Sequence, residues 1–342
     1  MQLHLHRYQL ETKSTFKIAR ASYNVRDLLV VELREGAISG YGEASGHSYY
    51  QVQIDELWEV LKKLKPIIEA YDFDTPEQFW KKMNPYLKNY SFAQCALDVA
   101  AHDFFGKKIG KPLYEIWGLK LENMPITDYT IGIDTIPIMV KKMQEMPWSV
   151  YKIKLGTTHD IEIIKALRSK TDVPFRIDAN CGWTAQETIE KSFDLKKLGV
   201  EFIEQPLAGG EFDEMEKVFK ESALPLFADE TCVREEDVAK CVGRFHGINI
   251  KLMKCGGLTP ARRMIAEARA LGLQVMAGCM MESSIGISAV AQLLPLLDYV
   301  DMDSILLIKK DIATGVKILE NGEVVFPERN GTGVELLEKN TI

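Results

Sequence analysis

The chain has 342 residues, of which 46% are hydrophobic and 27% are charged, and its formal net charge at pH 7 is -7. This is the composition of an ordinary soluble globular protein, and the length suits two domains or one barrel with an added domain. The acidic balance and the lack of a basic stripe argue against nucleic acid as a partner.

The sequence predicts neither a membrane span nor a disulfide framework. It has no run of about 18 apolar residues. The N-terminal stretch MQLHLHRYQLETKS lacks the basic-then-apolar pattern of a signal peptide, so we expect a cytoplasmic protein with no membrane partner. The six cysteines form no CxxC pair and are expected to behave as buried apolar residues.

The first third of the chain has an α+β pattern. Strands are predicted for residues 3–10, 28–33 and 36–45. Apolar residues at three- and four-residue spacings then predict helices over residues 51–70, 76–87 and 91–109. The last of these helices is followed by the Gly and Pro signals of a helix end.

From about residue 125, short β-rich runs alternate with helical runs. The predicted strands are ITDYTIGI, VYKIKLG, PFRIDAN, FIEQP, LFADE, INIKL, QVMAGC and YVDMDS. Eight strands alternating with helices predict a parallel (β/α) barrel. The rival architecture, a doubly wound open sheet, normally carries a glycine fingerprint after an early strand, and none is present.

These patterns divide the chain into an N-terminal α+β domain over residues 1–124, a barrel over residues 125–314 and a C-terminal segment over residues 315–342. The last segment contains VKILENGEVVFP, which predicts a small hairpin around Asn321-Gly322. We expect this segment to return to the N-terminal domain, because no low-complexity linker separates the parts.

Three carboxylates follow consecutive barrel strands. Asp178, Glu204 and Asp229 each end a predicted strand, at spacings of 26 and 25 residues, about one β/α unit. In a barrel, they lie on adjacent strands at the face where active sites form. Such oxygen ligands suit Mg²⁺, which leaves room for water and substrate. One acid at a strand end often caps the next helix, but three in register favour a metal site.

Lysines on two further strands predict proton transfer beside that site. Lys152 and Lys154 share one face of a strand, where apolar neighbours argue against the alternative of a solvated strand. Lys251 ends the sixth strand, which faces the second across the barrel mouth, so Lys154 and Lys251 would approach a substrate from opposite sides. The charges of Lys152 and Mg²⁺ should both favour the neutral, basic form of Lys154.

Other polar residues carry weaker signals. Lys254 is interpreted as a solvated loop residue without a role, and Glu230 is expected to point to the other side of the strand from Asp229. The six histidines lie in no catalytic motif and are expected to be structural or exposed.

Taken together, the stretches YKIKLG, RIDANCGW, FIEQPL, ADET and NIKLMKCGG resemble the muconate-lactonizing-enzyme subgroup of the enolase superfamily. The stretch CALDVAAHDFFGKKIGKPLYEIWG is similar to the signature helix of that family's capping domain. The resemblance covers essentially the whole chain. It implies a modified TIM (β/α) barrel and an α+β N-terminal capping domain that the C-terminal tail completes.

The resemblance also implies roles for the charged residues. One Mg²⁺ would be held by Asp178, Glu204 and Asp229. Lys154 and Lys251 would be the acid/base pair, and Lys152 would support the enolate or tune Lys154.

The end of the eighth strand narrows the implied substrate. Asp301-Met302-Asp303 resembles the Asp-x-Asp with which dipeptide epimerases of the subgroup hold the substrate's α-ammonium group. Helix-capping acids are the alternative. The resemblance implies an isomerase that inverts the C-terminal residue of an L-Ala-X type dipeptide by two-base 1,1-proton transfer through a Mg²⁺-stabilised enediolate.

The preferred side chain of that residue stays open. Loops over residues 14–26 and 46–51 are expected to close over the site. In one hypothesis Arg20 or Arg26 binds a Glu side chain; in the other the arginines are solvated and the pocket is apolar. Glu282, in CMMESSIG, matches a strand-seven motif and is a candidate substrate-binding residue.

Other functions remain as alternatives. An o-succinylbenzoate synthase, an N-acylamino-acid racemase or a muconate-type cycloisomerase acts on substrates without a free α-ammonium group, so Asp301 and Asp303 would be unnecessary. A Schiff-base aldolase would use Lys154 or Lys251 as a nucleophile, which borohydride trapping would reveal. A barrel that only binds a ligand is the furthest alternative. The oligomeric state, a homo-oligomer included, is open.

Overall fold

The computed structural model describes residues 1–18 and 21–337, so Arg20 lies outside the described residues. Its first layer is an antiparallel sheet in the order β1-β2-β3, formed by β1 (Gln2–Ile18), β2 (Ala21–Glu35) and β3 (Ile38–Ser45). The three predicted strands are confirmed, but the first two are longer than expected. Phe16 pairs with Tyr23 and Lys17 with Ser22. The prediction of a loop over residues 14–26 is therefore wrong, because cross-strand pairing continues beyond a bulge that follows Glu11.

Helices pack against this sheet. The predicted helices are confirmed as α1 (Ile54–Glu69), α2 (Pro76–Leu87) and α3 (Ser91–Ile109), and α4 (Leu113–Ile116) follows. The helix α3 lies so close to β3 that a Cβ atom on Gly42 would stand 2.1 Å from the Ala96 carbonyl oxygen. Glycine is needed there for close approach of the two backbones.

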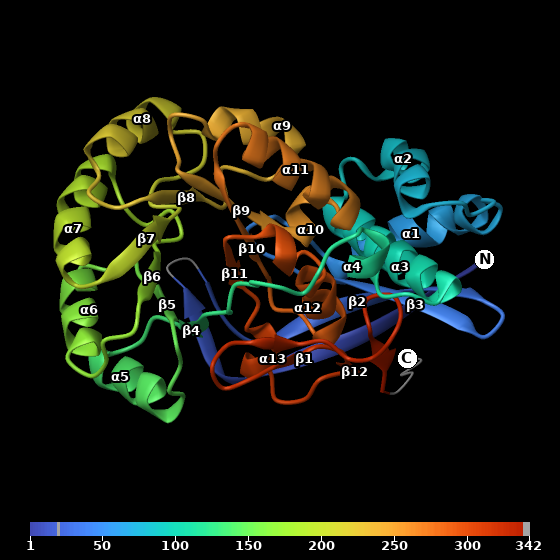
Figure 1. Cartoon of the computed structure of the whole chain (residues 1–342), viewed down its shortest axis with the longest axis horizontal. Helices are drawn as coiled ribbons and strands as arrows, with labels where there is room; N and C mark the ends of the chain where they lie inside the picture. The colour runs from blue at the N-terminus through green and yellow to red at the C-terminus, as the bar shows by residue number, and fades with distance from the viewer. Residues whose placement is uncertain (19–20, 338–342) are drawn as a thin grey trace.

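The second part is the predicted eight-stranded parallel barrel (Figure 1). Its strands, hydrogen-bonded in sequence order, are β4 (Tyr129–Ile131), β5 (Tyr151–Lys154), β6 (Phe175–Asp178), β7 (Val200–Glu204), β8 (Leu226–Ala228), β9 (Gly247–Lys251), β10 (Gln274–Gly278) and β11 (Tyr299–Asp301). A bridge between Thr127 and Val300 brings the first strand to the last. The Met302 N–H donates to Thr127 Oγ1 at 2.9 Å.

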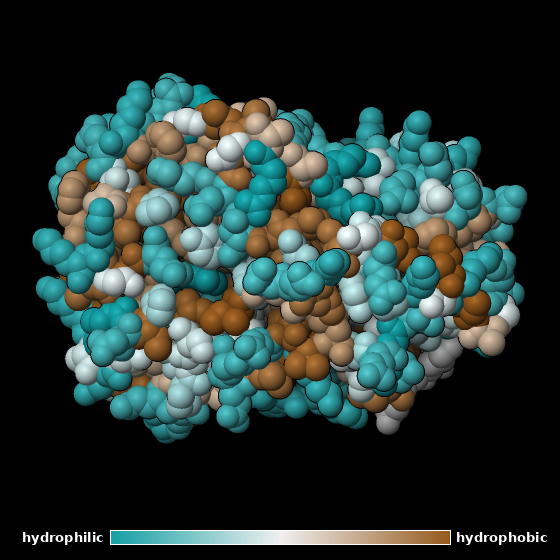
Figure 2. Space-filling view, in the orientation of Figure 1, coloured by the Kyte–Doolittle hydropathy of each residue, from teal (hydrophilic) through white to brown (hydrophobic). Residues whose placement is uncertain are grey.

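Helices surround the barrel, with α5 to α8 along its outer side in Figure 1. They are α5 (Ile136–Glu145), α6 (Asp160–Arg168), α7 (Ala185–Lys197), α8 (Phe212–Glu221), α9 (Glu235–Val238), α10 (Leu252–Cys255), α11 (Leu258–Ala270), α12 (Ser284–Ala291) and α13 (Ser304–Leu307). Figure 2 shows hydrophilic side chains over most of this view, interrupted by hydrophobic groups. Within the described ranges, no helix has both the length and the apolar character of a membrane span.

The C-terminal tail contacts the N-terminal helices. Strands β13 (Lys317–Ile318) and β14 (Val324–Val325) form the predicted hairpin, while β12 (Ala313–Thr314) pairs with β15 (Glu335–Leu336). The Thr332 N–H donates to the Asp103 carboxylate of α3 at 2.8 Å. The division into residues 1–124, 125–314 and 315–342 stays a prediction.

Candidate active site

Three carboxylates converge at one end of the barrel. Asp178 ends β6, Glu204 ends β7, and Asp229 directly follows β8. All three are buried, and one oxygen atom from each lies within 4.8 Å of the others. The parallel pairing of Asp178 with Glu204 fixes two of them side by side. A group of hard oxygen donors at this separation is chemically suited to Mg²⁺.

One lysine stands on each side of this cluster. Lys154, at the end of β5, places Nζ 2.6 Å from Asp178 Oδ2, and Lys251, at the end of β9, places Nζ 2.7 Å from Asp229 Oδ2. Burial opposes the charged form of Lys251, but the Asp229 carboxylate outweighs burial and raises the pKa of Lys251. Burial alone would raise the pKa of Asp178, yet Lys154 and Lys152 lower it to about 2. Lys251 is therefore held as a cation by a carboxylate that a metal ion would bind.

Lys152 lies beneath the cluster as a fixed cation. Its side chain is only 1% exposed, and Nζ lies 2.7 Å from both Glu204 Oε2 and Asp301 Oδ2 and 3.2 Å from Asp178 Oδ2. Burial opposes its charge, but these carboxylates raise the pKa of Lys152 well above its usual range. These contacts keep Lys152 positively charged. Its influence on Lys154 stays a prediction.

A cavity of about 310 Å³ opens above these residues, between the barrel and the N-terminal sheet. Lys154, Lys251 and Asp229 line it from the barrel. The N-terminal part contributes Phe16, Ile18, Tyr23, Arg26, His47, Ser48, Tyr49 and Tyr50. Both segments that were expected to cover the site therefore line the cavity, one as a hairpin and one as a turn.

Asp301 and Asp303 line the same cavity and have different surroundings. Asp301 Oδ2 accepts a hydrogen bond from Lys152 at 2.7 Å, while Oδ1 is buried without a hydrogen-bond partner among the described residues. Asp303 Oδ2 accepts from the Thr130 N–H at 2.6 Å. Burial and the neighbouring Asp301 raise the pKa of Asp303 to about 7. Two adjacent carboxylates, one with an oxygen that lacks a hydrogen-bond donor in the described chain, have the chemistry to bind a cation.

With this geometry established, comparison with known proteins identifies the family. Residues 4–118 match the N-terminal domain of mandelate racemase and muconate lactonizing enzymes, and residues 139–340 match the enolase C-terminal domain-like family. The chain belongs to the enolase superfamily. The resemblance of its motifs to that superfamily is thereby confirmed.

Characterised enolase-superfamily relatives cover almost the whole chain. An L-Ala-D/L-amino acid epimerase of Flavobacterium johnsoniae is 55% identical over 98% of this chain and 100% of its own length. The substrate-liganded L-Ala-D/L-Glu epimerase of Bacillus subtilis is 25% identical, with a TM-score of 0.92 and 98% coverage of both chains. A dipeptide epimerase of Enterococcus faecalis V583, complexed with Mg and L-Leu-L-Tyr, is 28% identical, with a TM-score of 0.89 and coverage of 97% of this chain and 98% of its own.

The interpretation of Lys254 as a solvated loop residue is wrong. The side chain is 1% exposed. Its ammonium group donates to Asp229 Oδ1 at 2.6 Å and to the carbonyl oxygens of Cys232 and Asn249 at 2.9 and 3.1 Å. Lys254 lies in the short helix α10, which is followed by Gly256 with a positive φ of 98°. The position of this helix brings the Lys254 side chain to Asp229. The one signal in the sequence is a charge inside the apolar run LMKCGG.

Two more residues lie close to the carboxylate cluster. Asn249, which no sequence motif singled out, donates from Nδ2 to Glu204 Oε1 at 2.7 Å. Glu230 lines the cavity together with Asp229, and the prediction that its side chain points to the other side of the strand stays a prediction.

Glu282 lies beside the cavity rather than among its lining residues. Glu282 Oε1 accepts from the Met280 N–H at 2.7 Å, and burial raises the pKa of Glu282 to about 7. Its contacts hold the backbone of the loop after β10, which carries Met280 and Met281 into the cavity wall. A direct role in substrate binding stays a prediction, as it does for Arg20. Arg26 does line the cavity, with its guanidinium carbon 3.5 Å from the centre of the Tyr23 ring.

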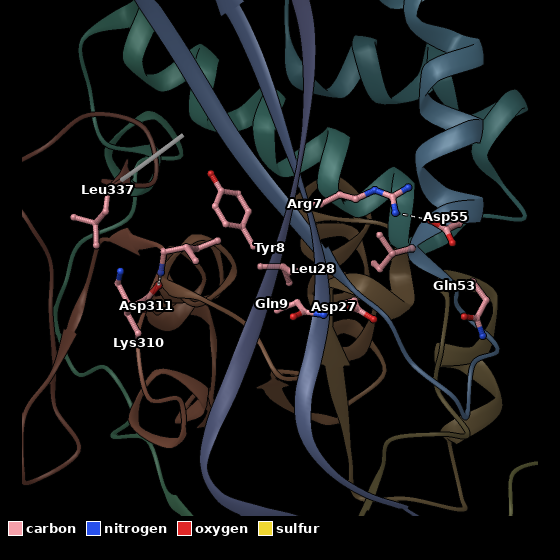
Figure 3. A pocket seen from close by; sticks show the side chains of 12 residues that line it. Arg7, Tyr8, Gln9, Asp27, Leu28, Gln53, Asp55, Lys310, Asp311 and Leu337 are labelled. Atoms are coloured by element: carbon pink, nitrogen blue, oxygen red, sulfur yellow. Dashed lines mark hydrogen bonds and ion pairs between the residues drawn. The ribbon is translucent and has the colours of Figure 1, made fainter. Parts of the chain in front are cut away.

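A larger cavity of about 840 Å³ lies elsewhere, between the β1–β2 strands and the segment over residues 310–312 (Figure 3). Its polar groups largely bind one another: Arg7 pairs with Asp55 at 2.5 Å, and Gln9 donates to Asp27 at 2.8 Å. It contains none of the converging carboxylates and lysines. The candidate active site is therefore assigned to the smaller cavity at the barrel mouth, because that cavity contains the converging carboxylates and lysines.

Proposed function

We propose that this enolase-superfamily chain is a dipeptide epimerase, which inverts the α-carbon of the C-terminal residue of an L-Ala-X type dipeptide. The observation that carries the proposal is the placement of Lys154 and Lys251 on opposite sides of one carboxylate cluster, next to the Asp301 and Asp303 pair. The names of the relatives support the same reaction class.

The carboxylate cluster fits one Mg²⁺. Asp178, Glu204 and Asp229 offer only oxygen donors, which lie within 4.8 Å of one another. Glu204 Oε2 has an ion pair with Lys152 at 2.7 Å but no hydrogen bond of good geometry among the described residues. When bound, Mg²⁺ supplies positive charge to the substrate carboxylate, which gains a second negative charge as its α-proton leaves. With the metal bound, Asp178 and Asp229 would no longer need the ion pairs with Lys154 and Lys251, whose Nζ atoms would be available to the substrate.

The two lysines then divide the proton transfer. One Nζ takes the α-proton from one side of the substrate, and the other Nζ gives a proton from the opposite side, which inverts the centre. Lys152 keeps its proton because the surrounding carboxylates raise its pKa. The ammonium group of Lys254 donates to Asp229 and to the Cys232 carbonyl oxygen. These buried charges hold the carboxylates in place around the reaction.

Asp301 and Asp303 bind the free α-ammonium group of the dipeptide in this proposal. Charge-assisted hydrogen bonds from an ammonium group would satisfy the unpartnered Asp301 Oδ1. An N-acylated substrate offers no such cation, and burying the two carboxylates beside it would be costly. The pair therefore favours a dipeptide over the substrates of the alternative enzymes.

A library of L-Ala-X dipeptides, with acidic and apolar X, tests the function in deuterated water containing Mg²⁺. We expect a mass gain of one deuterium and formation of the L,D diastereomer for at least one X, both lost on addition of EDTA. The Lys154→Met/Lys251→Met variant is the matched control. Turnover of N-acylamino acids with no exchange in any dipeptide would contradict the proposal.

A further inference from the structure

Three side chains at neighbouring strand ends form a second group of possible metal ligands, which shares no member with the carboxylate cluster. They are Cys279, directly after β10, Asp301, at the end of β11, and Asp303. One donor atom from each lies within 4.8 Å of the others, and all three line the cavity.

One member of this group has a carboxylate oxygen without a hydrogen-bond donor among the described residues. Asp301 is 5% exposed, and its Oδ1 has no hydrogen-bond partner in the described part of the chain, because Lys152 binds only Oδ2. A buried carboxylate oxygen without a donor is costly. A positive charge next to Oδ1 removes that cost.

We propose that Cys279, Asp301 and Asp303 form a second metal site, which binds one thiophilic divalent cation of the Zn²⁺ or Cd²⁺ class. Thiolate selects these soft ions, whereas the all-oxygen cluster of Asp178, Glu204 and Asp229 suits Mg²⁺. The two sites therefore differ in the ion that they prefer.

The geometry accommodates such an ion after small side-chain rotations. With metal–sulfur bonds of about 2.3 Å and metal–oxygen bonds of about 2.0–2.2 Å, the donors of a tetrahedral site lie roughly 3.3–3.7 Å apart. The present separations are at most 4.8 Å. Because all three residues line the cavity, water from the cavity would complete the coordination.

Binding exchanges a proton for the metal. Burial, followed by the charges of Asp301 and Asp303, raises the pKa of the Cys279 thiol well above its usual range. The S–H bond breaks as the S–metal bond forms, and one proton passes to solvent. No change in oxidation state is involved.

The metal and the dipeptide would compete, because the proposed ammonium subsite uses the same two carboxylates. This consequence rests on the proposed function, whereas metal binding itself does not. The cation is therefore expected to inhibit epimerisation competitively with the dipeptide at saturating Mg²⁺.

Titration of the full chain with Cd²⁺ at saturating Mg²⁺ tests the site, followed by the ultraviolet absorption of the cadmium–thiolate bond and by equilibrium dialysis. We expect one Cd²⁺ per chain with thiolate absorption, lost in Cys279→Ser and kept in Cys181→Ser, which removes the other half-buried cysteine. Binding without thiolate absorption, binding unchanged in Cys279→Ser, or binding only in the absence of Mg²⁺ would overturn the site.

A carboxylate variant and a competition experiment complete the test. Asp303→Asn should weaken Cd²⁺ binding at least tenfold while the thermal transition shows a folded chain; unchanged affinity would contradict the ligand set. A turned-over dipeptide should displace Cd²⁺. Failure to displace it would overturn the shared subsite, whereas absence of epimerase activity would overturn the proposed function, with the Cd²⁺ titration still decisive for the metal site.

Discussion

Both ends of the barrel bury charged groups, and each leaves one carboxylate oxygen without a hydrogen-bond partner among the described residues, Asp128 Oδ1 at the amino end and Asp301 Oδ1 at the carboxyl end. The difference is that Asp301 lines the cavity of the candidate site and Asp128 does not. At the amino end, the guanidinium of Arg176 binds Asp128 Oδ2 at 2.9 Å and Glu201 Oε2 at 3.0 Å, and it lies 4.9 Å from the centre of the Tyr299 ring. At the carboxyl end, several lysines and acids meet at the edge of that cavity.

The contrast separates a structural charge cluster from a ligand site. One arginine with two carboxylates and the Val300 carbonyl oxygen has its main donors used inside the protein. The carboxyl end keeps oxygen atoms available and opens into a cavity. Buried charge alone therefore does not indicate function in this barrel, whereas unmet donors and acceptors beside a cavity do.

The largest expected effect comes from removing a metal ligand at the carboxyl end. In Glu204→Gln, loss of several kcal/mol of charge stabilisation should lower kcat/KM by about 10³-fold or more. Burial and Asp178 raise the pKa of Glu204. Because its charge is unfavourable without metal, the metal-free variant should unfold at the same or a higher temperature. Steady-state kinetics measure the loss in kcat/KM, and thermal denaturation measures the unfolding temperature. A kcat/KM within tenfold of the parent value would contradict the assignment of Glu204 as a metal ligand.

At the amino end, Arg176→Met should act on stability instead. The change leaves Asp128 buried without its cation and should lower the free energy of unfolding by about 3–5 kcal/mol. Epimerase activity per folded molecule should persist. Urea denaturation with parallel kinetics measures the two effects. A stable variant that loses activity would place Arg176 in the active site and break the contrast between the ends.

A smaller effect is expected below the metal cluster. Lys254→Met removes one of the two ammonium groups that hold Asp229 and should weaken Mg²⁺ binding or activity about 10- to 100-fold. The matched control is Lys240→Met, which breaks the exposed pair with Asp237 at 2.8 Å. Mg²⁺ titration of activity compares the two, and equal effects would contradict the positioning role of Lys254.

The smallest expected effect is on the pH dependence of stability. It arises at the contact between the N-terminal sheet and the barrel. Glu43 on β3 accepts from the Ser283 and Gly286 N–H groups at 2.8 and 2.9 Å, at the start of α12. Burial and Glu282 raise the pKa of Glu43 to about 8. The folded state therefore binds this proton more tightly than the unfolded state, and stability falls as pH rises from about 4 to 8.

The variant Glu43→Gln removes that proton linkage. The decrease of Tm between about pH 6 and 8 should become shallower, while the exposed control Glu56→Gln leaves it unchanged. Thermal scans across this range provide the measurement. An undiminished slope in Glu43→Gln would show that Glu43 is ionised in the folded protein.

The sequence predicted the elements whose signal is local or periodic. Strand-end acids at one β/α spacing marked the metal cluster, and i, i+2 lysines marked the face of β5. The sequence did not place Lys254, because a four-residue helix and Gly256 decide its direction. It missed the long β1–β2 hairpin because residues 11–24 lack an alternating apolar pattern, and pairing across the strands forms the hairpin instead. Contacts between distant segments, such as Glu43 with Ser283, leave no local signal at all.

Stereochemically resolved proton exchange tests the central claim most directly. Lys154→Met and Lys251→Met are each incubated with the L,L and L,D forms of a turned-over dipeptide in deuterated water, and deuterium at the α-carbon is measured. Two bases on opposite sides predict that neither variant epimerises and that each exchanges only one diastereomer, a different one for each variant. Continued epimerisation by either variant, or exchange of the same diastereomer by both, would contradict the two-base account.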